Sequence, residues 1–122
     1  MPFWLVAMFD ALERVFHERG RLAICSALLA EGGSVSFRAL QDACDLTDGN
    51  LNRHLHALAE LGIVAMTRKT GPGRPQTVVR ITPKGRERFL AYIDALEAVV
   101  RSVQQSAMNP AKPSRQPRLA TE

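Results

Sequence analysis

The sequence lacks several features that mark well-defined classes of protein. None of its apolar runs approaches the roughly 18 consecutive residues that a membrane span requires. The opening residues have no basic segment and lead directly into Asp10 and Glu13, so we expect no signal peptide. Only two cysteines are present, which fits a reducing compartment. These absences predict a globular, cytoplasmic protein without a membrane partner.

Signatures of catalysis and of cofactor binding are missing as well. The chain has no glycine-rich phosphate loop, no pairing of a nucleophile with a base and no spacing typical of metal ligands. His54 and His56 are two positions apart, so on a helix they point to different sides and cannot bind one metal together. We therefore expect no enzymatic activity, no cofactor and no metal site.

The most informative stretch runs from Thr47 to Leu61. Thr47 is a good N-cap, because its hydroxyl can accept a hydrogen bond from a first-turn amide, and Gly62 is a typical helix end. One stripe repeats at i, i+4 and i+7 and indicates a buried face: Leu51, Leu55 and Leu58. The stretch therefore predicts an amphipathic helix that packs against a core.

The opposite face of this helix carries glycine and side chains that form hydrogen bonds: Gly49, Asn50, Asn52, Arg53 and His56. A merely solvated helix usually shows Glu and Lys in i, i+4 pairs. Arginine matches guanine, and asparagine matches adenine, in the major groove of DNA. We predict that Arg53 is the main base contact and that the two asparagines and His56 contact phosphates or bridging waters. The alternative for the whole helix is an ordinary surface helix. For His54 two positions are left open: half-packed in the structure or on the DNA side.

Basic residues are concentrated after this helix. Residues 66–90 hold seven Lys and Arg side chains against Glu87 alone, whereas residues 1–65 are net acidic. Residues 63–67 and 77–81 are rich in β-branched side chains and predict two strands. The loop between them combines glycine with proline, which predicts a stiff hairpin with a positively charged tip: Arg68, Lys69 and Arg74. A basic hairpin beside such a helix favours a polyanionic partner.

The rest of the chain predicts a compact set of helices around these two elements. In order, the predicted elements are a helix over 3–16, a helix over 21–30, an extended piece at 34–35, a helix over 37–44, the helix over 47–61, the hairpin and a last helix over 83–105. Gly20 separates the first two helices, and Ser36 caps the third. The third and fourth helices form a helix-turn-helix, whose second member enters the major groove.

The fold class predicted by this order is α+β, mainly α with a small β-hairpin. It corresponds to a winged helix-turn-helix with an extra N-terminal helix and a long C-terminal helix. Residues 1–106 are expected to form one domain. Residues 107–122 contain three prolines and three basic residues without an apolar period, which predicts a disordered tail.

Three segments carry a resemblance to a known family: LTDGNLNRHLHALAELGIV (46–64), GRPQT (73–77) and ITPKGR (81–86). Together they resemble the winged helix-turn-helix transcriptional regulators of the MarR/ArsR-like type, especially the short stand-alone winged-helix DNA-binding proteins of bacteria. The resemblance implies a homodimer on double-stranded DNA, with the 47–61 helix in the major groove and the 68–76 wing on the minor groove or backbone. The paired-cysteine motif of the ArsR metal sensors is absent, so metal sensing is not implied.

The DNA-contacting residues expected from this reading are Ser36, Thr47, Gly49, Asn50, Asn52, Arg53, His56, Arg68, Lys69 and Arg74. The dimer interface is expected on the flanking helices 3–19 and 83–106, where apolar residues repeat at 4-3-4-3 spacing. These interface residues are Leu5, Phe9, Leu12, Phe16, Phe89, Ile93, Leu96, Val100 and Val103. A two-fold dimer implies a pseudo-palindromic operator with half-sites about 10 bp apart or a multiple of that. A monomer whose terminal helices cover the winged core is the alternative.

Three further alternatives are left open by the sequence. Cys25 and Cys44 are expected to be small buried hydrophobes, with a redox switch between the second and third helices as the alternative. The module could instead bind RNA or another protein, because a fold alone does not determine function. A small-molecule effector of unknown identity is also left open.

Overall fold

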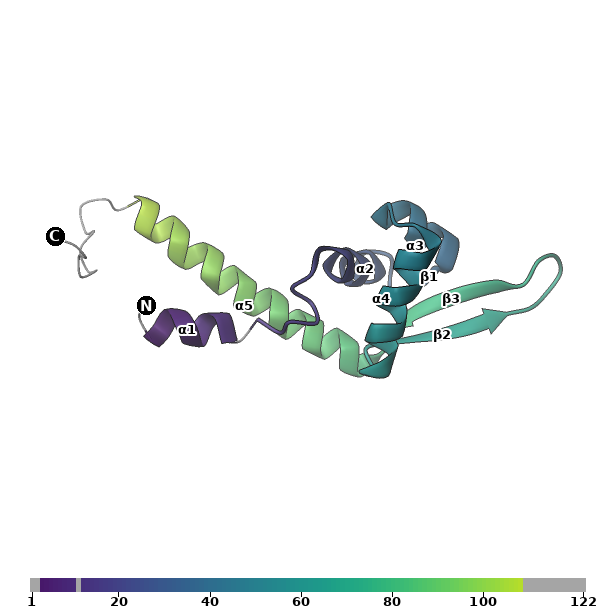
Figure 1. Ribbon diagram of the computed structural model, residues 1–122, viewed down its shortest axis with the longest axis horizontal. Coiled ribbons are helices and arrows are strands. Elements are labelled where there is room, and N and C mark those ends of the chain that lie inside the picture. The colour runs from purple at the N-terminus through teal and green to yellow at the C-terminus, as the bar shows by residue number, and fades with distance from the viewer. Residues whose placement is uncertain (1–2, 11, 109–122) are drawn as a thin grey trace.

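The computed structural model describes residues 3–10 and 12–108, apart from the side chain of Leu5. The elements are α1 (Phe3–Asp10), α2 (Arg19–Ala30), β1 (Ser34–Ser36), α3 (Phe37–Cys44), α4 (Asp48–Glu60), β2 (Val64–Lys69), β3 (Gln76–Ile81) and α5 (Pro83–Met108). Figure 1 shows the β2–β3 hairpin extending from one side of the helices and α5 extending from the other. The mainly helical fold with a small sheet, predicted as a winged helix-turn-helix, is confirmed.

The helix-turn-helix has the boundaries that its capping residues predict. The Ser36 hydroxyl accepts a hydrogen bond from the Ala39 amide at 3.1 Å and begins α3, and Thr47 does the same for Asn50 and begins α4. Between the helices, Asp45 adopts a left-handed conformation at φ 54°. Such local hydrogen bonds set where a helix begins, so α4 leaves the turn in a defined direction.

The sheet is antiparallel, and its strand order is β1-β3-β2. Val79 in the central strand pairs with Val35 on one side and Met66 on the other. Both hairpin strands are longer than predicted, because pairing continues as far as Lys69 opposite Gln76. The hairpin therefore reaches well beyond the core and carries its basic tip away from the helices (Figure 1).

The core lies where α2, α3, α4, the sheet and the first half of α5 meet. Its fully buried members include Ile24, Leu28, Leu40, Leu51, Leu55, Leu58, Ile63 and Val79. The leucine stripe predicted for α4 is thus confirmed as its inner face. Gly85 at the start of α5 touches the backbone carbonyl of Ile63 so closely that no larger residue would fit there. This close approach fixes the start of α5 against the segment that joins α4 to β2.

The prediction of one helix over residues 3–16 is wrong over residues 12–16. Residues 12–18 form turns instead, and they bring Phe16 into a fully buried aromatic cluster. The Phe16 ring centroid lies 5.2 Å from that of Phe89 and 5.6 Å from that of Tyr92. Burial of Phe16 against α5 requires the chain to bend here, and aromatic packing of this kind rewards the bend.

Gly20 does not separate two helices, which corrects another prediction. It lies inside α2, which begins at Arg19 after Glu18 caps it by accepting the Arg21 amide at 2.9 Å. Gly20 is buried, and a Cβ atom on it would lie 2.5 Å from Nε2 of His54. The glycine is therefore needed for a close contact between α2 and α4.

The C-terminal helix is longer than predicted, because α5 continues to Met108. Figure 1 shows α1 lying beside the distal half of this helix, and Ser102 is 3.9 Å from the Met8 sulfur. The predicted disordered tail over 107–122 is therefore wrong at its first two residues, and the rest of that prediction lies outside the described residues. Among residues 3–10 and 12–108, no helix combines the length and apolar character needed to cross a bilayer.

Candidate nucleic-acid interface

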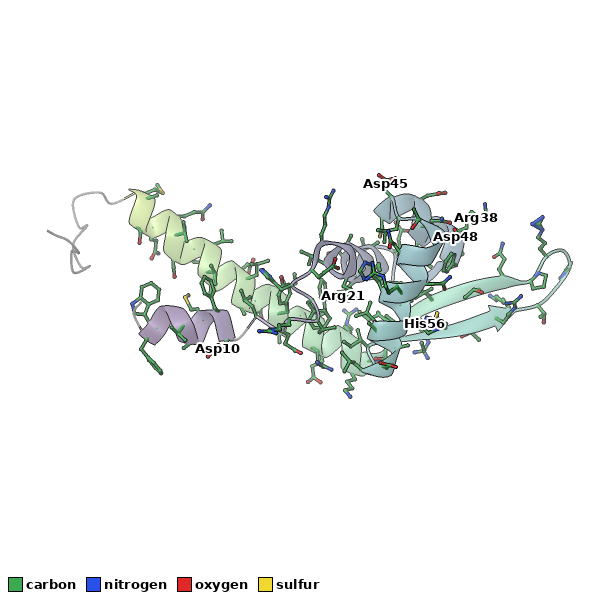
Figure 2. The ribbon with its side chains drawn as sticks, in the orientation of Figure 1. Asp10, Arg21, Arg38, Asp45, Asp48 and His56 are labelled. Atoms are coloured by element: carbon green, nitrogen blue, oxygen red, sulfur yellow. The ribbon has the colours of Figure 1, made fainter. Side chains whose placement is uncertain are left out.

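The outer face of α4 is exposed along its whole length. Gly49, Asn50, Asn52, Arg53 and His56 all lie on the solvent side, opposite the buried leucines. Figure 2 shows Asp48 near the start of α4 and His56 further along it. Positions 49, 52, 53 and 56 follow helical i, i+3, i+4, i+7 spacing, so they form one ridge. The helix offers this ridge, and no apolar patch, to a partner.

Arg53 and Asn50 hold one another in position on this face. The Arg53 Nη2 group donates a hydrogen bond to Oδ1 of Asn50 at 3.0 Å. The Asn50 amide group and the remaining guanidinium N–H groups then stay free to donate outward. Two neighbouring donors of this kind fit an acceptor-rich target such as the guanine edge or a phosphate.

His56 is held by the backbone of its own helix. Its Nδ1 atom lies 2.9 Å from the main-chain carbonyl oxygen of Asn52. The contact restricts the ring to one orientation on the exposed ridge. A restrained ring loses less conformational freedom when it contacts a partner.

The hairpin adds three exposed cations to this region: Arg68, Lys69 and Arg74. Gly73, beside Arg74, has φ 96°, a left-handed conformation that glycine adopts without strain. Arg74 also lines a cleft of about 290 Å³ between the hairpin and the start of α3, together with Ser36 and Arg38. The cleft brings positive charge from two separate parts of the chain together.

Arg38 is a candidate residue that the sequence reading missed. It is exposed in the first turn of α3, and Figure 2 shows it on the helix beside the start of α4. The sequence contained a signal for this residue. A cation in the first turn of a helix is unfavourable for the helix dipole, and a bound anion would offset that effect. The Ser36 hydroxyl is less available for a DNA contact than predicted, since it already accepts the Ala39 amide as the cap of α3.

A family model described as a winged helix DNA-binding domain matches residues 21–100 of this chain. The matched range contains the helix-turn-helix, the hairpin and most of α5. The chain belongs to the family of winged helix DNA-binding domains. The expected resemblance to winged helix-turn-helix regulators is confirmed at this level.

Individual relatives agree with the family assignment. The uncharacterized protein MJ0432 of the archaeon Methanocaldococcus jannaschii is 39% identical over 80 residues, which are 66% of this chain and 86% of that protein. The structure of a transcriptional regulator homologue from Pyrococcus horikoshii OT3 is 30% identical with a TM-score of 0.73, and the match covers 81% of this chain and 95% of that one. The likeness to a transcriptional regulator homologue supports DNA-binding regulation, and the archaeal relative MJ0432 shows that the resemblance is not confined to bacteria.

A more distant neighbour shares only the fold. The structure of overoxidized AbfR bound to DNA is 18% identical, with a TM-score of 0.59, and the match covers 88% of each chain. At this identity the likeness concerns the arrangement of helices and strands. The winged helix of the present chain therefore has a DNA-bound structural counterpart, whose contacts are its own.

His54 of this winged helix domain is a structural residue. It is 4% exposed, and its Nδ1 atom lies 3.4 Å from Nη1 of Arg21 and 3.8 Å from Oε1 of Glu18. Burial lowers the pKa of His54, and the neighbouring Glu18 carboxylate partly opposes this effect. Of the two alternatives, packing is therefore correct, and the ring is more deeply buried than the half-packed position suggested by its place on the helix.

The cysteines of the domain differ in environment from a reactive thiol. Cys25 is fully buried and Cys44 half-buried, and both are free thiols. Burial raises the pKa of Cys25 to about 12, with a smaller contribution from Cys44. Because thiol exchange proceeds through the thiolate, this environment favours the role of small hydrophobes.

Among the residues that the structure describes, no group of three or more His, Cys, Asp or Glu side chains could hold a metal ion.

The predicted interface residues divide into two groups in the single chain. Phe16 is fully buried and Phe89 is 2% exposed, so both belong to the core and offer no surface to a second chain, which corrects their assignment. The others with described side chains are exposed or half-buried: Phe9, Leu12, Ile93, Leu96, Val100 and Val103. The side chain of Leu5 lies outside the described part. Two aromatic residues of α1 that were not predicted, Phe3 and Trp4, are 84% and 55% exposed.

Proposed function

We propose that this protein is a transcriptional regulator that binds specific sequences of double-stranded DNA as a homodimer. The observation that carries the proposal is the outer ridge of α4, where, within the part of the chain that the structure describes, Arg53 and His56 form hydrogen bonds only inside their own helix. In the proposed complex α4 lies in the major groove and Arg53 contacts a guanine. No enzymatic role is proposed, and a DNA ligand fits the expected cytoplasmic location.

The hairpin is proposed to contact the minor groove or the DNA backbone. Arg74 extends from its tip, and a narrow minor groove attracts arginine because its negative potential is enhanced. Arg68, Lys69 and Arg38 are proposed to contact phosphates, which position the protein along the duplex without reading its sequence. Ser36 and Thr47 lie at the starts of α3 and α4, and they are proposed to contact the DNA backbone there, together with the first amides of α4.

The homodimer is proposed to form through the exposed apolar side chains of α1 and α5. Val100 and Val103 on α5 are 46% and 62% exposed, and Phe9 on α1 is 46% exposed. Phe3 and Trp4 extend this surface. We propose that these side chains together form an apolar interface patch, because large exposed apolar patches typically mark interfaces. A two-fold dimer would present two α4 helices to half-sites about one DNA turn apart, which implies a pseudo-palindromic operator.

Effector binding stays a prediction without an assigned ligand. A cleft of about 460 Å³ lies next to the proposed dimer surface and is lined by Phe9, Asp10, Leu12, Arg14, His17, Leu96 and Val99. A small molecule bound there would contact both terminal helices. Such a ligand would therefore be expected to alter the spacing of the two α4 helices in a dimer.

The decisive experiment is a selection of random duplex DNA with the purified chain, with RNA as competitor. We expect a pseudo-palindromic site, and Arg53→Ala should lose about 1–3 kcal/mol of binding free energy and blur one base position per half-site. Arg86→Ala is the matched control, because Arg86 is an exposed cation near the start of α5 that belongs to neither the proposed DNA contacts nor the proposed dimer surface. Selection of no DNA sequence by a monomeric protein, or preference for RNA, would refute the proposal.

A second measurement concerns the hairpin. Arg74→Ala should weaken binding to all duplexes alike and reduce the dependence of log affinity on log salt by about one unit, since one fewer counterion is released. The selected sequence at the α4 contacts should stay the same. A salt dependence identical to that of the wild type would show that Arg74 does not contact DNA.

A further inference from the structure

The contact between His56 and its own helix determines where the ring carries its hydrogen. The Asn52 carbonyl oxygen, 2.9 Å from Nδ1, can only accept a hydrogen bond. Nδ1 must therefore carry the hydrogen and donate it. In the neutral imidazole the other nitrogen, Nε2, then has no hydrogen and is an acceptor.

The ring that carries this acceptor lies on the exposed face of α4. His56 is exposed, and within residues 3–10 and 12–108 its ring makes no other hydrogen bond. It lies on the outer ridge of α4 three residues after Arg53, so the two are about 4.5 Å apart along the helix axis. That separation is close to one base step of DNA, about 3.4 Å.

An acceptor at this place excludes one class of contact and selects another. Phosphate oxygens are also acceptors, so the neutral ring cannot donate to them through Nε2. In the major groove, hydrogen-bond donors are offered only by adenine, through N6, and by cytosine, through N4. Arg53 differs, because it has donors alone and matches the O6 and N7 acceptors of guanine.

We propose that His56 is a specificity-determining residue that accepts a hydrogen bond, through Nε2, from the exocyclic amino group of an adenine or cytosine next to the guanine contacted by Arg53. This inference rests on the proposed function, since it needs α4 in the major groove. It replaces the expectation that His56 meets a phosphate or a bridging water. The ridge thus pairs a donor at position 53 with an acceptor at position 56.

The test compares selected sites at about pH 8, where an imidazole is neutral. The wild-type site should show adenine or cytosine beside the Arg53-dependent guanine, and His56→Ala should lose that preference with about three- to tenfold weaker binding, the value of one hydrogen bond. His56→Lys, which can only donate, should shift the preference towards guanine or thymine. Ser26→Ala is the control, because Ser26 is exposed on α2 away from the ridge, and it should leave the selected site unchanged.

A duplex lacking the amino group separates the two bases and tests the contact directly. Replacement of adenine by purine, or of cytosine by its 4-unsubstituted analogue, should weaken the wild type and leave His56→Ala unaffected. The base whose substitution has this effect is the one contacted. A site that keeps its Arg53 position but shows the same neighbouring base for wild type and His56→Ala would overturn this inference alone. Absence of any selected site would overturn the proposed function instead.

Discussion

The two faces of α4 are explained by different kinds of contact. On the inner face Leu51, Leu55 and Leu58 are fully buried, and His54 is held by α2. Every residue type there follows from a neighbour inside the chain. On the outer face, and among the described residues, Arg53 and His56 form hydrogen bonds only within their own helix. Their types are unexplained by the fold, so an external partner is the simplest physical reason for them.

The glycines show the same contrast between positions explained by a contact inside the chain and a position that is not. Gly20 faces the buried ring of His54, and Gly85 faces the backbone of Ile63. A Cβ atom on Gly49, in contrast, would meet nothing within 4 Å, and its φ is not positive. Glycine in a helix is less stable than alanine, so Gly49 costs stability without an internal reason. We infer that close approach of DNA is what the missing side chain permits.

The largest effect is expected from Gly20→Ala. The new Cβ would lie 2.5 Å from Nε2 of His54, and relief of this overlap should cost about 1–3 kcal/mol of unfolding free energy. Denaturant unfolding of both proteins measures the loss. The double variant with His54→Ala removes the obstructing ring, so the two changes should combine with clearly less than the sum of their separate losses. Additive losses would show that Gly20 and His54 are not in contact.

The intermediate effect is expected from Gly49→Ala, and it should have opposite signs for folding and binding. The unfolding free energy should stay the same or rise by up to about 1 kcal/mol, since alanine favours the helix. DNA affinity should fall about tenfold, which is about 1.4 kcal/mol, because the added methyl group stands between α4 and the duplex. Thermal unfolding and DNA titration measure the two quantities.

The control for Gly49→Ala is a change that favours a helix away from the proposed interface. Ser26 is exposed on α2, and Ser26→Ala should raise helix propensity without altering DNA affinity. If Gly49→Ala binds DNA as tightly as the wild type does, the outer face of α4 is not closely approached at its start. The comparison of the two faces would then lose its clearest example.

Local signals in the sequence predicted the DNA-binding part of the fold well. The caps at Ser36 and Thr47 depend on neighbouring residues, and they were predicted correctly together with the leucine stripe of α4. Contacts between distant residues could not be predicted in this way. The turn that buries Phe16 depends on α5, more than 70 residues later, and Gly20 was read as a helix break because its reason, His54, lies on another element.

The candidate site shows the same division. The exposed set on α4 followed from helical periodicity, whereas Arg38 joins Arg74 only because β1 pairs with β3 and brings the start of α3 to the hairpin. The orientation of His56 was also inaccessible, since it depends on a hydrogen bond to a backbone carbonyl. Periodicity therefore predicts which side chains are exposed, and the structure is needed for how they are oriented.

The smallest effect is expected in the pH dependence of stability and concerns His54 on the inner face. Burial lowers its pKa from the ordinary value of 6.5, so the folded chain favours the neutral ring. As pH falls below about 6.5 the unfolded chain takes up a proton that the folded chain resists, and the unfolding free energy decreases. Glu18, whose pKa is lowered mainly by the Arg21 amide, loses its contribution only at lower pH, below 4.5.

Unfolding curves of the wild type and His54→Gln between about pH 8 and 5.5 isolate this effect, because the other histidines are common to both proteins. The wild type should lose stability more steeply as pH falls, whatever the difference in stability at pH 8. Equal slopes would mean that His54 takes up a proton as readily in the folded chain as in the unfolded one. Burial would then fail to account for the one polar side chain on the inner face of α4, and the contrast between its faces would have to be argued from the leucines alone.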